Sequence, residues 1–185
     1  MKRQRAGIPI LFFLLLLVLP LNSQESGESG RDLVPDGYRE IKLGMDLELV
    51  KNLLQKDPYF LFRGDPDVSM LERPNTTLIE CRGSYHIDRA FFQFYQEKLY
   101  IIILLLNPEP LDHYAVYTAL LEKYGKPVFF SPKNITWGGP EVELSLERPL
   151  TVKYIDLKVF EEINSQRGTE EAHLEVLRED FLKRF

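Results

Sequence analysis

The chain has 185 residues, enough for one domain or two small ones, and its formal net charge is −5. A surface of this charge repels nucleic acid and anionic lipid head groups, so neither is an expected partner. Its one cysteine, Cys81, excludes an intramolecular disulfide, and a core rich in Phe and Tyr must therefore stabilise the fold. We expect Cys81 to be a buried strand residue; an intermolecular disulfide is the alternative.

Residues 1–23 have the pattern of a cleavable signal peptide. Three basic residues precede an apolar segment at 8–21, which is shorter than the roughly 20 residues of a membrane-spanning helix. The small side chain of Ser23 predicts cleavage between Ser23 and Gln24; an uncleaved N-terminal anchor is the alternative. Cleavage would leave 20 basic and 28 acidic residues, with no direct membrane anchor and no cysteine placed for lipid attachment.

A polar tether without periodicity follows at residues 24–36, and order is expected to begin near Gly37. Asp46 is placed to cap a first helix, which ends before Pro58 because the residue preceding a proline avoids the α region. The apolar positions at 47, 50, 53 and 54 fall on one face of this helix.

Four strands and two turns are predicted next, at 59–62, 76–82, 89–95 and 99–106, with turns at 63–67 and 96–97. The segment 99–106 is apolar at every position. Its length is too short for a membrane and typical of a strand buried on both faces, so we expect it at the centre of the main sheet.

A second helix is predicted between a cap at Asp112 and a C-terminal glycine at Gly125. Short strands follow at 128–131, 135–137, 142–147 and 150–155. Because a helix followed by strands occurs twice, residues 37–106 and 107–156 are predicted to be two related units of one 37–156 domain.

The segment 157–185 is predicted to be helical, with a short helix at 157–164, a linker at 165–168 and a final helix capped by Thr169. One face of the final helix carries an apolar strip: Leu174, Leu177, Phe181 and Phe185. The strip either packs on the domain's own sheet or docks into a groove of a partner protein. The acidic start of the helix disfavours binding to a membrane surface.

At the start of the first helix, Gly44 and Met45 are followed by Val50 and Leu54. This pattern resembles the start of the first helix in the BamE/SmpA family, small outer-membrane lipoproteins of the β-barrel assembly machinery. Asp46 replaces the usual Ser or Thr cap of that family. The tandem helix-plus-sheet order is also similar to the β-lactamase inhibitory protein-like fold group. These resemblances imply an α+β fold and a role in binding other proteins. The missing lipobox cysteine departs from the lipoprotein pattern.

Candidate chemistry is sparse. Asp65 and Asp67 lack the further spaced oxygen ligands of a calcium loop, which favours a plain turn. The three histidines have no metal-ligand spacing, so no metal and no cofactor is predicted. Cys81 with His86 is the one nearby nucleophile–base pair, without an oxyanion-loop signature, and no catalytic residue is assigned. Trp137 is expected in the core or in a hairpin, with a sugar site as the alternative.

Taken together, the pattern predicts an α+β protein with an antiparallel sheet packed by helices. The expected function is a non-enzymatic binding or assembly role in the periplasm or cell envelope, with another envelope protein as partner. A secreted hydrolase with an unrecognised site and a purely structural envelope protein are the alternatives.

Overall fold

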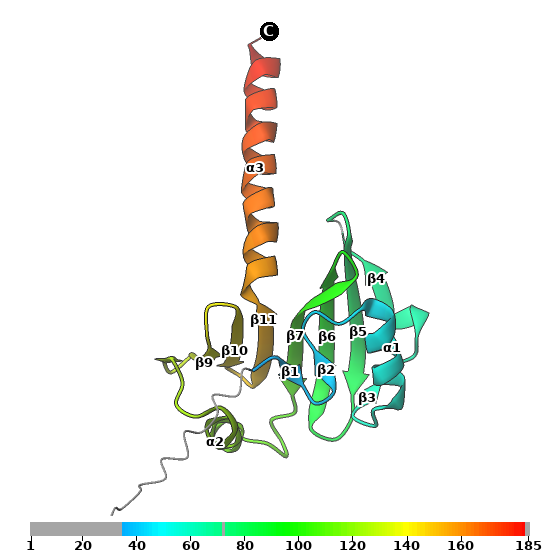
Figure 1. Ribbon diagram of the computed structural model, residues 1–185, viewed down its shortest axis with the longest axis vertical. Coiled ribbons are helices and arrows are strands. Elements are labelled where there is room, and N and C mark those ends of the chain that lie inside the picture. Colours follow the sequence, from blue (N-terminus) through cyan, green and yellow to red (C-terminus); the bar gives the residue numbers. More distant parts are fainter. Residues whose placement is uncertain (1–34, 72, 184–185) are drawn as a thin grey trace, which may run out of the picture.

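The computed structural model describes residues 35–71 and 73–183, and it has the predicted α+β architecture (Figure 1). A large antiparallel sheet has the strand order β3-β5-β6-β7-β11-β10-β9-β8, with β4 also paired to β5. Its strands are β3 (Phe60–Leu61), β4 (Val68–Met70), β5 (Thr76–Gly83), β6 (Ile87–Tyr95), β7 (Lys98–Leu106), β8 (Phe129–Phe130), β9 (Asn134–Gly138), β10 (Val142–Glu147) and β11 (Thr151–Asp156). A small separate hairpin pairs β1 (Gly37–Tyr38) with β2 (Ile41–Lys42).

Two helices cover one face of the sheet. They are α1 (Leu47–Lys56) and α2 (His113–Tyr124). Val50 and Leu54 from α1 and Leu120 from α2 are buried in one continuous core with the inward side chains of the strands. The buried pair on α1 lies within the predicted apolar face, because residues four apart in a helix point the same way.

The two helix caps differ. Asp112 accepts a hydrogen bond from the Ala115 amide at 2.7 Å, as expected of an N-cap. Asp46 holds the N-cap position of α1, but its side chain caps no amide and pairs instead with Lys98 at 2.8 Å. Asp46 therefore links the start of α1 to the start of β7.

Each half of the sheet consists of a helix followed by strands that pair in chain order. α1 precedes β3, β5, β6 and β7, whereas α2 precedes β8, β9, β10 and β11. The last strand of each half meets the other antiparallel, as Ile103 pairs with Lys153. A duplicated unit would produce this mirrored strand order, and the duplication itself stays a prediction.

β7 is central in the sheet and buried on both faces, as predicted. Ile102 and Leu104 point into the core under α1 and α2, and Ile101 points to the opposite face. The register of β6 and β7 shifts beside Tyr100, since Phe94 pairs with Leu99 and Gln93 with Ile101. This bulge sends Tyr100 and Ile101 to the same face, where they form a second, smaller hydrophobic cluster.

The C-terminal segment is one continuous helix, α3 (Leu157–Leu182), so the predicted linker at 165–168 is wrong. Asp156 is its N-cap and accepts a hydrogen bond from the Val159 amide at 3.1 Å, whereas Thr169 lies inside the helix. A single interior Gly, Gly168, costs a helix only about 1 kcal/mol, which the helix-forming neighbours can absorb.

Among the described side chains of α3, those of its first turns pack on the sheet. Ile163 is buried against Tyr100 and Ile101, and the Gln166 side chain accepts a hydrogen bond from the Tyr95 hydroxyl at 3.1 Å. Beyond this contact the helix extends away from the sheet along its own axis (Figure 1). The second hydrophobic cluster therefore anchors a projecting helix.

Candidate functional site

The part of α3 beyond Gly168 exposes the predicted apolar strip. Leu174, Leu177 and Phe181 are spaced three and four residues apart, which places them on one face of the helix. Their exposed fractions are 57%, 52% and 60%. Packing of the strip on the domain's own sheet is thus contradicted by the structure, and Phe185 lies outside the described residues.

Two further apolar side chains of this segment are exposed although the predicted strip does not include them. Val176 lies on a different face of α3 from Leu174, and Leu182 follows Phe181. An apolar side chain that stays exposed forgoes much of the free energy that full burial would provide, about 1.5–3 kcal/mol for a Leu or Phe. The segment therefore has the composition of an interaction surface.

Cys81 and His86 do not form a nucleophile–base pair in the structure. Cys81 is 2% exposed and its side chain belongs to the core, while His86 is exposed in the turn between β5 and β6. Burial, followed by the carboxylates of Asp67 and Glu80, raises the pKa of the Cys81 thiol to about 12. A thiolate nucleophile needs the opposite shift.

The predicted turn at 63–67 contains a short 3₁₀ segment, η1 (Asp65–Asp67), which holds a buried carboxylate. The Asp67 side chain is 2% exposed and pairs with the guanidinium of Arg63. It also accepts a hydrogen bond from the Arg63 backbone amide at 2.8 Å. Asp67 closes the turn, and its oxygens are committed to Arg63 rather than turned outward as calcium ligands.

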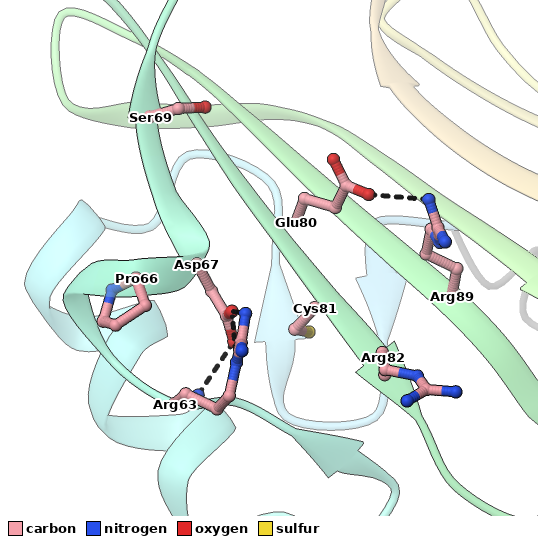
Figure 2. A pocket seen from close by; sticks show the side chains of 8 residues that line it. All are labelled: Arg63, Pro66, Asp67, Ser69, Glu80, Cys81, Arg82 and Arg89. Atoms are coloured by element: carbon pink, nitrogen blue, oxygen red, sulfur yellow. Dashed lines mark hydrogen bonds and ion pairs between the residues drawn. The ribbon is translucent and has the colours of Figure 1, made fainter.

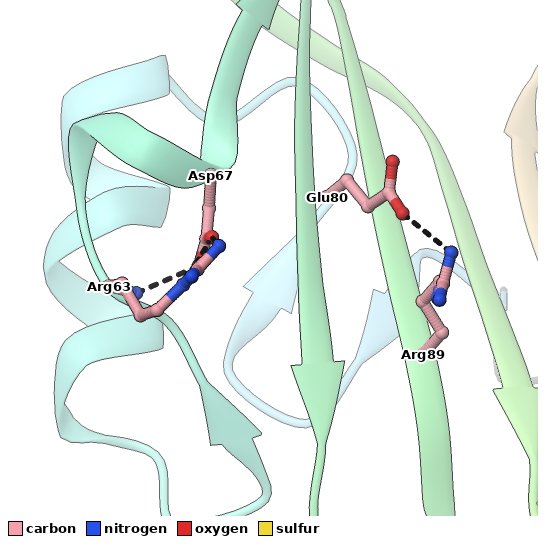
Figure 3. A network of polar contacts seen from close by, with 4 residues as sticks. All are labelled: Arg63, Asp67, Glu80 and Arg89. Carbon is pink, nitrogen blue, oxygen red and sulfur yellow. Dashed lines mark hydrogen bonds and ion pairs between the residues drawn. The ribbon is translucent and has the colours of Figure 1, made fainter.

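Beside this turn lies a pocket of about 400 Å³ that no sequence motif indicated (Figure 2). Its charged lining consists of Arg63 and Asp67 from the turn, Glu80 and Arg82 from β5, and Arg89 from β6. Arg89 donates to Glu80 at 2.8 Å, so the pocket contains two separate ion pairs (Figure 3). Sequence spacing could not reveal this cluster, because strand pairing brings it together.

Trp137 is a core residue, as expected. It is almost completely buried, and its indole nitrogen donates to the Gly125 carbonyl at 2.9 Å, which ties β9 to the end of α2. Trp137 also lines a second pocket, of about 530 Å³, together with Val128, Tyr124 and Pro140. Because Trp137 is only 2% exposed, little of its ring faces this pocket for stacking on a sugar.

Of the three histidines, His113 is the first residue of α2, where burial lowers the pKa of its imidazole. Among the side chains that the structure describes, no three His, Cys, Asp or Glu gather as a metal site would require. Within residues 35–71 and 73–183, no helix combines the length and apolarity needed to cross a bilayer.

Family membership is shown by a match to the TP0088 domain over residues 36–166. The chain belongs to the TP0088 domain family. No curated protein and no solved structure matches it. The family domain comprises the sheet, α1, α2 and the sheet-packed start of α3, and it ends at Gln166, the residue bonded to Tyr95. The exposed apolar strip lies beyond it.

Proposed function

We propose that this TP0088-domain protein is exported with removal of residues 1–23 and acts in the cell envelope as a binding or assembly protein. The observation that carries the proposal is the exposed apolar strip formed by Leu174, Leu177 and Phe181 on the projecting half of α3. Such a helix binds by laying its apolar face into a groove of another protein.

The charge of the helix defines the partner more closely. Residues 169–182 contain five acidic residues and one arginine. Complementary potentials favour a groove that is apolar at its base and rimmed by Lys or Arg. The partner is therefore an envelope protein with a basic, apolar-floored groove, and the same acidity opposes docking on an anionic membrane.

The binding proposal is tested by crosslinking in the native host. The double variant Leu174→Asp/Leu177→Asp should lose the partner that the parent protein captures, because a charge would have to enter the groove. Val176→Asp is the control for each of the two substitutions: it adds one negative charge at an exposed apolar position on a different helix face, and it should retain the partner. Equal capture by all three proteins would overturn the proposal.

The export proposal has a separate test. The protein purified from its host should begin at Gln24, because Ser23 supplies the small side chain that signal peptidase requires before the cut bond. N-terminal sequencing or intact mass measures this directly. A protein that still begins at Met1 would exclude a cleaved signal peptide.

A further inference from the structure

The arginine-lined pocket arises from a gap in the strand pairing along one edge of β5. β4 pairs with β5 as far as Ile79, and β3 resumes pairing at Arg82. Between them, neither strand covers Glu80 and Cys81 on that edge, and the turn at Arg63–Asp67 closes the far side (Figure 2). The pocket is therefore a consequence of how the strands pair.

Positive charge exceeds negative charge in this pocket, although the protein as a whole is acidic. Two carboxylates face three guanidinium groups. Asp67 forms an ion pair with Arg63, and Glu80 forms an ion pair with one nitrogen of Arg89. Among the ion pairs between described residues, none involves Arg82. Each guanidinium has five N–H donors, so most donors in the pocket have no carboxylate to bind.

The two strand arginines occupy directly opposed positions. Arg82 on β5 and Arg89 on β6 are register partners, so both side chains emerge on the same sheet face. Like charges at opposed positions destabilise a strand pair, and Glu80 offsets only one of the two. A bound anion between the two guanidinium groups would neutralise the repulsion that the protein leaves in place.

We propose that this pocket binds an oxyanion, a phosphate or carboxylate group that bridges Arg82 and Arg89, with Arg63 as the third cation. Guanidinium groups bind both kinds of anion through paired N–H donors. The proposal is independent of partner binding by α3, since the pocket and the projecting half of that helix share no residue.

The test is an amide NMR titration of the purified protein with inorganic phosphate and, separately, with succinate. Resonances of β5 and β6 should shift, and Arg82→Gln or Arg89→Gln should weaken binding about tenfold, the loss expected for a charge-assisted contact. Glu80→Gln should strengthen binding, because it releases Arg89. Arg73→Gln, which removes an exposed arginine outside the pocket, should leave binding unchanged.

The melting temperature of each variant separates loss of binding from unfolding. Arg82→Gln removes one of two opposed charges and should leave the melting temperature unchanged or raise it. Phosphate and succinate could give no response while vesicles containing phosphatidylglycerol bind, with binding that requires Arg82 and Arg89. In that case the oxyanion belongs to a lipid head group. Equal loss in Arg73→Gln would overturn the proposal. So would the absence of any response to phosphate, succinate and vesicles.

Discussion

The thiol of Cys81 lies on the core face of β5, beneath the turn that holds Asp67. Two influences act on it in the same direction: burial removes water from the thiolate, and two nearby carboxylates repel its charge. Both raise the pKa of this side chain, to about 12. A cysteine in this setting packs as a small apolar group, and oxidation or nucleophilic attack requires the domain to open first.

This shift predicts a loss of stability in alkali. The unfolded thiol ionises near its ordinary pKa of 9.0, whereas the folded thiol stays protonated up to about 12. The stabilisation is complete below pH 9 and decreases as the pH rises towards 12, because the unfolded state then binds fewer protons. Between pH 8 and pH 10 the free energy of unfolding should fall by about 1.4 kcal/mol from this group alone.

Urea unfolding of the parent and of Cys81→Ala, at both pH values, isolates the contribution of the thiol. The alanine variant is less stable at pH 8, because it leaves a small cavity, but it should lose less stability on going to pH 10. Buried tyrosines such as Tyr154, whose pKa is also raised by burial, affect both proteins equally. Identical losses in the two proteins would contradict the assigned shift.

At the scale of elements, the continuity of α3 through Gly168 can be tested. Gly168 is helical, and a Cβ added there would meet nothing within 4 Å. Gly168→Ala should therefore stabilise the local helix by about 1 kcal/mol, mainly by restricting the unfolded backbone. Amide hydrogen exchange in the second half of α3 should slow about fivefold, the ratio that corresponds to this free energy.

The matched variant Gly168→Pro should act in the opposite direction, since proline removes an amide donor and clashes with the preceding turn. Exchange beyond residue 168 should then accelerate, while exchange in β6 and β7 stays unchanged. If neither substitution altered exchange in α3, residues 165–168 would behave as the linker that the sequence pattern predicts, and the continuous helix would be wrong.

The sequence pattern within each segment predicts most helices and strands of this fold, because turn residues, caps and apolar spacing within the segment determine them. The hairpin turn at Gln96 and Glu97 adopts positive φ at both residues, and an apolar run produces the central strand β7. Gly168 is a common helix-stop residue and Thr169 is a common N-cap residue, so the sequence pattern predicts a linker before a new helix. The helix propensity of the residues on both sides outweighs these two signals, and the helix continues.

The arginine pocket could not be predicted in the same way. Arg63, Arg82 and Arg89 belong to a turn and two strands, and only the register of β5 with β6 makes two of them neighbours. Register depends on the hydrophobic pattern of the whole sheet. The apolar strip of α3 is the opposite case: its spacing was visible in the sequence, but its exposure depends on where the sheet ends.

At the scale of the whole molecule, the family domain and the projecting half of α3 should be separable. Removal of residues 169–185 deletes the exposed strip, and no described residue of this segment belongs to either hydrophobic cluster. The melting temperature should therefore change by no more than about 2 °C, because few buried contacts are lost.

Removal of residues 157–185 should have a different result. This truncation also deletes Ile163 and Val159, which exposes Tyr100 and Ile101 on the sheet. Loss of one buried Ile costs about 2–5 kcal/mol, so the melting temperature should fall by about 10 °C or more. Ile163→Ala in the full chain serves as the control and should reproduce a large part of the fall.

Thermal unfolding followed by circular dichroism distinguishes the two truncations. A collapse after removal of 169–185 would make the distal helix part of the core and would leave it no surface for a partner. Retained stability, together with loss of the crosslinked partner, would assign folding to the domain that ends near Gln166 and binding to the helix beyond it. The second hydrophobic cluster then holds that helix in a fixed direction, which reduces the conformational entropy lost when a partner binds.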